Sequence, residues 1–115
     1  MAFELACALS DIPTDEAKKV TLGRYDLALA RCGDEVFAIQ DLCSHASVAL
    51  SEGEVVAEGS GCHIECWLHG SMFDLRTGEP TGLPATEPVA TFAVEVREEA
   101  VYVDTETVLN GVTPY

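Results

Sequence analysis

Two short clusters of cysteine and histidine offer four metal ligands: Cys43 and His45 in the first, Cys66 and His69 in the second. Thiolates and imidazoles are donors that bind zinc and iron-sulfur centres, and each cluster supplies one of each. A zinc ion would take all four donors as a closed tetrahedral site. A 2Fe-2S cluster would divide them, with two cysteines on one iron and two histidines on the other. The spacing therefore predicts a metal centre and leaves these two alternatives open.

The residues around the ligands carry further information. The segments CSHASVALSEGEV (43–55) and CWLHGSMFDLRTGEP (66–80), followed by GLPA (82–85), resemble the Rieske ferredoxins that serve bacterial ring-hydroxylating dioxygenases. The resemblance extends over nearly all of the 115 residues. It implies an all-β fold, a small antiparallel β-sandwich of the Rieske type with a cluster-binding subdomain inserted at one end.

The resemblance also assigns the parts of the site. It implies cluster-binding loops at about 43–50 and 66–73, and a proline loop at about 82–88 that covers the cluster. The cofactor would be one Rieske-type 2Fe-2S cluster per chain. Its implied ligands are two cysteines on the inner iron and two histidines on the outer iron: Cys43, Cys66, His45 and His69.

The function implied by the resemblance is electron transfer. A soluble one-electron carrier would receive electrons from a flavin reductase and pass them to a terminal Rieske non-haem iron oxygenase, without catalysing a reaction itself. Two alternatives stay open. The chain could be a Rieske ferredoxin with another redox task, such as one linked to iron-sulfur cluster assembly, or a zinc-stabilised binding module with no redox role.

Two features depart from the family pattern. The spacer between the ligand pairs, residues 46–65, is a few residues longer than usual, and we expect the extra length in an acidic loop at 52–61. Trp67 stands where relatives often have proline. Its indole could shield the cluster or meet a partner, but we expect it to fill the core next to Phe73.

Length and termini limit the possible functions. A chain of 115 residues predicts a single domain spanning 1–115, too short to add the catalytic domain of an oxygenase. The N-terminal residues include no basic start and no long apolar run, so we expect neither a signal peptide nor a membrane anchor, and a cytoplasmic protein. Val48 and Leu68 occupy the positions where the Rieske subunits of cytochrome bc complexes carry a disulfide, so that disulfide cannot form.

The chain has five cysteines. In a cytoplasmic protein, cysteines that are not ligands are expected to be free thiols rather than disulfides. We therefore expect Cys7, Cys32 and Cys62 to be free thiols, with Cys7 and Cys32 as small buried hydrophobes. For Cys62 an alternative stays open, because with His63 it forms a second Cys-His pair close to Cys66 that could join a zinc site. In an extended segment, Cys62 and Cys66 would share one face, whereas His63 would lie on the other and face solvent.

Period-two alternation of apolar residues predicts half-buried β-strands. The predicted strands are Tyr25–Arg31, Val36–Ile39, Thr91–Arg97 and Val101–Val103. Turns at 33–34 and 98–99 would join them as two antiparallel hairpins. No segment shows a helical stripe, and residues 14–19 are expected to form one helical turn at most.

The charge is strongly acidic. Six basic and twenty acidic residues give a formal net charge of −14. Nucleic acids and anionic membranes are therefore disfavoured as partners, whereas basic patches on redox proteins are favoured. Solubility alone would also account for an acidic surface. The candidate docking residues are Glu52, Glu54, Glu58 and Glu65, and we expect a monomeric carrier.

Two residues near the second ligand pair bear on the reduction potential. Ser71 occupies the position where high-potential relatives place a hydroxyl donor to a bridging sulfide, and Phe73 stands where those relatives have tyrosine. Hydrogen bonds to the sulfurs raise the potential of such clusters, which ranges from about −150 to +300 mV. With no disulfide and at most one of the two hydroxyls, we expect a potential at the low end of this range.

Overall fold

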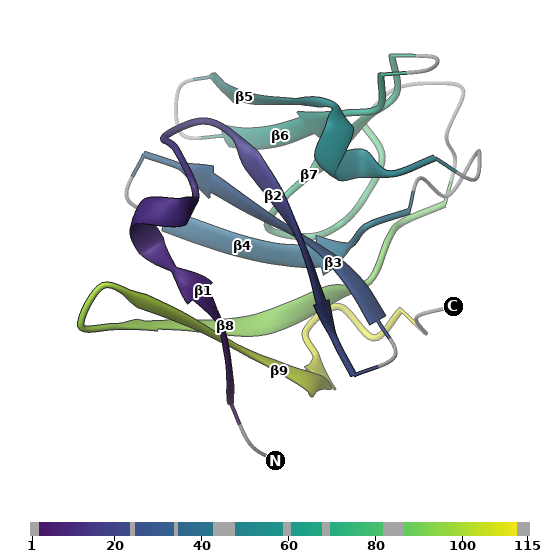
Figure 1. Ribbon diagram of the computed structural model, residues 1–115. Coiled ribbons are helices and arrows are strands. Elements are labelled where there is room, and N and C mark those ends of the chain that lie inside the picture. Colours follow the sequence, from purple (N-terminus) through teal and green to yellow (C-terminus); the bar gives the residue numbers. More distant parts are fainter. Residues whose placement is uncertain are drawn as a thin grey trace.

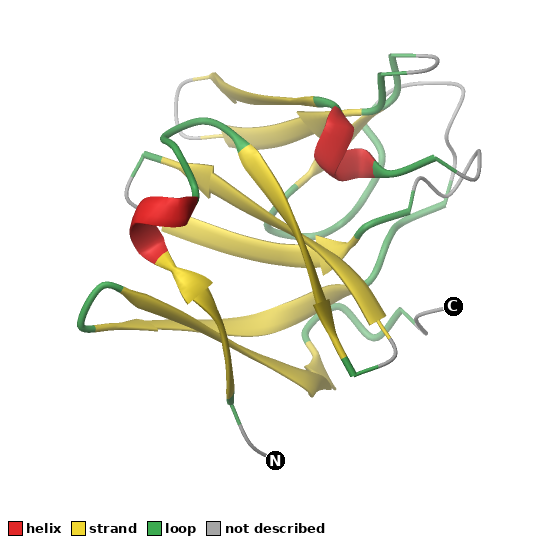
Figure 2. Cartoon of the chain, viewed as in Figure 1, coloured by secondary structure: helices red, strands yellow, loops and turns green. Residues whose placement is uncertain are grey.

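The computed structural model describes residues 3–23, 25–33, 35–42, 48–58, 61–67, 70–81 and 87–112. Within these ranges the regular structure consists of β-strands and two single-turn 3-10 helices (Figure 1, Figure 2). The strands are β1 (Glu4–Ala8), β2 (Ala17–Leu22), β3 (Tyr25–Cys32), β4 (Glu35–Gln40), β5 (Glu54–Glu58), β6 (Gly61–Glu65), β7 (Met72–Asp74), β8 (Thr91–Arg97) and β9 (Ala100–Val108). The 3-10 helices are η1 (Leu9–Asp11) and η2 (Leu50–Glu52). No helix in this part of the chain has the length and apolar character needed to cross a bilayer.

Six strands form the larger sheet, in the order β1-β9-β8-β4-β3-β2, and every neighbouring pair is antiparallel. Both predicted hairpins, β3–β4 and β8–β9, are confirmed. The β8–β9 turn is tight, because Glu98 and Glu99 both have positive φ angles, 49° and 64°. Such turns match the right-handed twist of the strands that they connect. At residues 14–19, where one helical turn at most was expected, no helix forms, because residues 17–19 belong to β2 and pair with β3.

Strand β3 is buried on both faces. Leu27 and Leu29 pack into the core on one side of the larger sheet, among residues of β4, β8 and β9. Ala28 and Ala30 point to the other side, into the core beneath the smaller sheet. The half-buried strand predicted here was therefore wrong in its exposure, since a second layer covers the face that alternation assigned to solvent. Small alanine side chains let that layer approach closely.

The smaller sheet contains β5, β6 and β7 in that order, and both pairs are antiparallel. It lies at one end of the molecule (Figure 1). Its strand β5 lies in the acidic stretch 52–61, where a loop was expected. That prediction was wrong because Val55 pairs with Ile64 of β6 and both are buried. The antiparallel sandwich with a subdomain at one end is confirmed.

A disulfide between Cys32 and Cys62 links the two sheets. Cys32 ends β3 and Cys62 lies near the start of β6, with Cα atoms 6.2 Å apart. The expectation that both are free thiols was wrong. Each side chain points from its own strand into the core between the sheets, so the two sulfurs meet there. Cys7, on β1, is free as expected, but it is half-buried rather than buried.

Candidate metal centre

Of the four predicted ligands, the structure describes Cys66. Cys43, His45 and His69 lie outside the described residues, as do residues 82–86 of the predicted proline loop. Within the part of the chain that is described, no three His, Cys, Asp or Glu side chains are grouped to hold a metal ion. The site must therefore be built from Cys66 and from the residues that flank the two ligand segments.

Cys66 directly follows β6, with its side chain 1% exposed and its thiol free. It shares the buried face of this strand with Cys62 and Ile64, as the parity of an extended segment predicted. His63 lies on the opposite face and is half-buried rather than fully exposed. A buried thiol at the end of a strand is well placed to serve as an inner-shell metal ligand.

Two main-chain hydrogen bonds close the second ligand segment. The amide of Cys66 donates to the carbonyl oxygen of Ser71 at 2.6 Å, and the amide of Gly70 donates to the carbonyl oxygen of Cys66 at 2.9 Å. Gly70 has a φ of 76°, a conformation that glycine adopts without strain. These two bonds and the conformation of Gly70 hold Cys66 and Ser71 close together.

The first ligand segment is closed by a side-chain clamp. The carboxylate of Asp41 accepts two hydrogen bonds of 2.6 Å, one from the amide and one from the hydroxyl of Ser51. Asp41 is 5% exposed and lies just before the segment, whereas Ser51 follows it in η2. Sequence reasoning missed both residues. Their one signal was their position on either side of the ligand pair.

The fold brings the ends of the two ligand segments together. Glu54 begins β5 just after the first segment, and it pairs directly with Glu65, which ends β6 just before Cys66. Gly53 makes this approach possible, because a Cβ atom there would overlap the main-chain carbonyl of Glu65. Leu50, buried, belongs to the same core as Cys66. Two segments distant in sequence thus meet at one end of the smaller sheet.

Ser71 and Phe73 are both completely buried behind the second segment. Phe73 packs in the core that contains Cys66. The space next to Phe73 is not taken by Trp67, whose side chain is 52% exposed. The expectation that Trp67 fills the core was therefore wrong. Phe73 lies on the buried face of β7, whereas Trp67 lies in the turn that follows Cys66.

The charge on this part of the chain has one sign. No lysine or arginine occurs between Arg31 and Arg76, a stretch that includes both ligand segments. The carboxylates in the same stretch are Asp34, Glu35, Asp41, Glu52, Glu54, Glu58, Glu65 and Asp74. Glu54 and Glu65 lie directly opposite each other, an arrangement that costs stability because like charges repel across a strand pair.

Arg76 fixes the turn after β7 against the larger sheet. Its guanidinium donates hydrogen bonds of 2.8 and 3.0 Å to the carboxylate of Glu35 and lies 5.1 Å from the centre of the Phe37 ring. These hydrogen bonds lower the pKa of Glu35 and raise the pKa of Arg76. The contact lies at the start of β4, whereas Cys66 lies at the other end of the smaller sheet.

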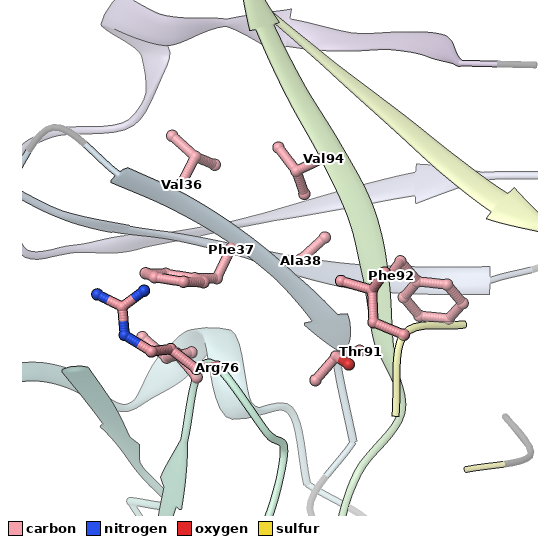
Figure 3. A pocket seen from close by; sticks show the side chains of 9 residues that line it. Val36, Phe37, Ala38, Arg76, Thr91, Phe92 and Val94 are labelled. Atoms are coloured by element: carbon pink, nitrogen blue, oxygen red, sulfur yellow. The ribbon is translucent and has the colours of Figure 1, made fainter. Parts of the chain in front are cut away.

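A shallow groove of about 300 Å³ lies next to this ion pair, where β4 and β8 separate beyond the paired Ala38 and Phe92 (Figure 3). Its lining is mainly apolar, with Val36 and Val94 across from each other. It includes none of the predicted ligands. The groove is therefore separate from the candidate metal centre.

Comparison with known proteins places this geometry in a family. The Rieske 2Fe-2S domain matches residues 3–93. The chain is 41% identical to Ferredoxin CarAc of Metapseudomonas resinovorans over 98 residues, which cover 84% of this chain and 88% of that protein. These matches confirm the resemblance seen in the sequence.

Two solved structures share the fold. The ferredoxin of carbazole 1,9a-dioxygenase from Nocardioides aromaticivorans IC177 superposes with a TM-score of 0.83 and 34% identity, covering 90% of this chain and 97% of that one. The ferredoxin in a complex of reduced oxygenase and oxidized ferredoxin in carbazole 1,9a-dioxygenase gives a TM-score of 0.77 and 39% identity, covering 88% and 91%. The chain thus belongs to the Rieske 2Fe-2S domain family, and its cofactor is a Rieske-type 2Fe-2S cluster.

Proposed function

We propose that Cys43 and Cys66 bind one iron of the cluster and that His45 and His69 bind the other. The cysteines support this assignment by elimination. Cys32 and Cys62 are joined to each other, and Cys7 lies on β1 of the larger sheet, paired with Val101 of β9. Of the five cysteines, two are then left to supply thiolates, the number that mixed ligation requires.

The protein acts as an electron carrier rather than as an enzyme. When bound, the cluster takes up and releases one electron, and the protein makes no bond to a substrate. The chain's own residues hold the ligand segments in place. The Asp41–Ser51 clamp closes the first segment, and the hydrogen bonds of Cys66 close the second. Burial of Cys66 keeps water from this ligand.

The electron partners are a flavoprotein reductase and a terminal oxygenase of an aromatic-ring dioxygenase system. The names of the relatives support this assignment, as does the solved complex of oxygenase and ferredoxin. The alternative of a role in iron-sulfur cluster assembly has no comparable support among these relatives. A zinc module does not agree with membership of a 2Fe-2S family.

The docking surface lies at the acidic end that carries the ligand segments. Its acidic residues attract a basic partner surface, and the repulsion between the facing Glu54 and Glu65 is relieved when such a partner binds. Trp67 supplies an apolar anchor next to Cys66, because an exposed indole can bury a large area in a partner's pocket. We assign this surface to partners with an apolar pocket surrounded by lysine or arginine.

The buried thiol of Cys66, closed into a tight turn and flanked by the clamped first segment, is the observation that carries the proposal. The experiment is electron paramagnetic resonance of the dithionite-reduced protein. A rhombic signal with an average g value below that of all-cysteine clusters is expected. A colourless, silent protein that contains zinc would overturn both the ligand assignment and the carrier function.

Three further properties complete the proposal. Residues 1–115 form one domain, with the cluster-binding loops at about 43–50 and 66–73 and the proline loop at about 82–88. The protein works as a monomer in the cytoplasm. Sedimentation of the cluster-containing protein tests the monomer, since a stable dimer would double the measured mass.

A further inference from the structure

The disulfide between Cys32 and Cys62 fastens the smaller sheet at the end farthest from the ligand segments. Strand β6 runs from Gly61 to Glu65, so Cys62 lies near its start and Cys66 follows its end. Figure 1 shows the start of β6 beside the end of β3, while the opposite ends of β5 and β6 point toward the other side of the molecule. One end of the sheet is thus held covalently, and the other end carries the ligand Cys66.

The ring that the disulfide closes includes the first ligand pair. Cys32 and Cys62 are separated by 30 positions, and both Cys43 and His45 lie between them. Cys66 follows Cys62 by one strand length. The covalent bond therefore restricts the chain on both sides of the first ligand segment and just before the second, whether or not the sheets are packed together.

Other polar contacts between the two sheets are reversible. The Asp41–Ser51 clamp connects the end of β4 to η2, and the Glu35–Arg76 ion pair connects the start of β4 to the turn after β7. The ion pair is exposed to solvent, where such pairs contribute little to stability. The disulfide is the contact whose loss would most loosen the packing of β6 on β3.

The two sulfur-bearing side chains are shielded from solvent. Cys32 is 8% exposed and Cys62 is 5% exposed. A thiolate must approach a sulfur atom to break a disulfide, so attack has to follow a local separation of the sheets. In chains that work in a reducing compartment, disulfides that persist are commonly redox-sensing or catalytic.

We propose that Cys32 and Cys62 form a thiol–disulfide exchange site that controls how firmly the protein retains its cluster. The reagent class is a dithiol, small or protein-borne. One thiolate of the dithiol attacks a sulfur of the pair, forming a mixed disulfide and releasing the other cysteine as a thiolate. The second thiol of the dithiol then displaces the first cysteine. The pair gains two electrons and two protons, and the dithiol leaves as a disulfide.

Reduction loosens the smaller sheet from β3 and lets the two ligand segments move apart. Oxidation of the pair to the disulfide holds the two ligand segments in place. The state of the pair thus sets the lifetime of the cluster-containing protein, without changing the ligands. The consequence for cluster retention rests on the proposed ligand assignment, whereas the existence of the exchange site does not.

The first test counts thiols in the purified wild-type protein. The protein is denatured with iodoacetamide present, with or without prior reduction by dithiothreitol, and weighed by mass spectrometry. Since the chain has five cysteines and the disulfide removes two, three labels are expected without reduction and five with it. Peptide mapping should locate the two additional labels at Cys32 and Cys62. Five labels without reduction would overturn the proposal.

The second test measures cluster loss from the visible absorbance of the anaerobic protein at a fixed temperature. Dithiothreitol should accelerate the loss by about tenfold, a fraction of what cross-linking a loop of this length contributes. A double variant, Cys32→Ala and Cys62→Ala, should lose the cluster at the fast rate with or without dithiothreitol. This variant also controls for extraction of iron by the reagent.

Cys7→Ala is the matched control, because it removes a free cysteine from the larger sheet and should keep the wild-type response to dithiothreitol. If the wild type loses its cluster at the same rate with and without dithiothreitol, the disulfide does not govern how firmly the cluster is retained. Failure of the ligand assignment is distinguished by the resonance spectrum of the untreated protein, which does not depend on the thiol count.

Discussion

The amide of Cys66 donates a hydrogen bond of 2.6 Å to the carbonyl oxygen of Ser71, so a proposed cluster ligand and a buried hydroxyl side chain lie at the two ends of one closed turn. This arrangement holds the Ser71 side chain close to the ligand segment. Phe73, equally buried, adds no hydroxyl. The environment thus offers at most one of the two hydroxyl donors expected in high-potential relatives.

Replacing Ser71 by alanine should lower the reduction potential by about 20–60 mV. A hydrogen bond contributes about 0.5–1.5 kcal/mol, and 59 mV corresponds to about 1.4 kcal/mol for one electron. Protein-film voltammetry measures the change. Thr81→Ala is the control, because it also removes a nearby hydroxyl, but an exposed one that donates its hydrogen bond to the carbonyl oxygen of Met72. An unchanged potential in the Ser71 variant would exclude a hydrogen bond to the cluster.

Replacing Asp41 by asparagine should weaken the closure of the first ligand segment. The carboxylate accepts both hydrogen bonds from Ser51, whereas an amide can place only one oxygen there. We expect the free energy of unfolding to fall by about 1–3 kcal/mol, the cost of leaving a buried donor unsatisfied. Urea denaturation followed by circular dichroism provides the value. Asp26→Asn, at an exposed site, should change it much less.

Replacing Trp67 by alanine should weaken binding to the oxygenase by about 30-fold, the effect of losing an anchor worth about 2 kcal/mol. The side chain is half exposed, so the fold and the resonance spectrum should remain as in the wild type. Leu109→Ala, 62% exposed and outside the acidic stretch, is the control. Calorimetric titration that finds equal affinity for the Trp67 variant would remove Trp67 from the docking surface.

Binding to either partner should also weaken as salt is added, since screening reduces the attraction between oppositely charged surfaces. The double variant with Glu54→Gln and Glu65→Gln removes two charges from the acidic end. Its association rate should change less with salt than that of the wild type. Stopped-flow association rates at several salt concentrations measure it. A rate that does not change with salt in the wild type would argue that the acidic residues serve solubility alone.

The pKa of Glu35 should rise toward its ordinary value in Arg76→Gln, because the variant removes the hydrogen bonds that lower it. A lowered pKa in the folded state means that the ion pair stabilises the fold above the ordinary carboxyl pKa. This contribution is lost as the pH falls through the folded-state value. Titration of the Glu35 carboxyl by nuclear magnetic resonance tests the shift. Arg97→Gln, which breaks the Arg97–Glu95 pair instead, should leave Glu35 unaffected.

The sequence was sufficient to predict the strands whose apolar residues alternate without interruption. Strand β8 has the predicted bounds, and β3 and β4 extend theirs by one or two residues. Strand β5 was missed because its apolar run, 55–57, is short and has a glutamate at each end, a composition that is typical of a loop. Its formation depends on pairing with β6, a contact that local composition does not reveal.

The candidate site was predictable as a set of residue types but not as an arrangement. The parity of β6 correctly placed Cys62 and Cys66 on one buried face. It did not reveal that Cys62 meets Cys32, because that contact depends on how one sheet lies over another. The exposure of Trp67 depends similarly on the direction in which the chain leaves Cys66.

The absence of lysine and arginine from residues 32–75 has a consequence for encounters between two copies of this protein. Two acidic ends repel each other, so the ligand segments of one carrier rarely approach those of another. Self-exchange of electrons between carriers is therefore slow. Each reduced carrier therefore keeps its electron until it binds a basic partner, and it transfers that electron directly to the partner.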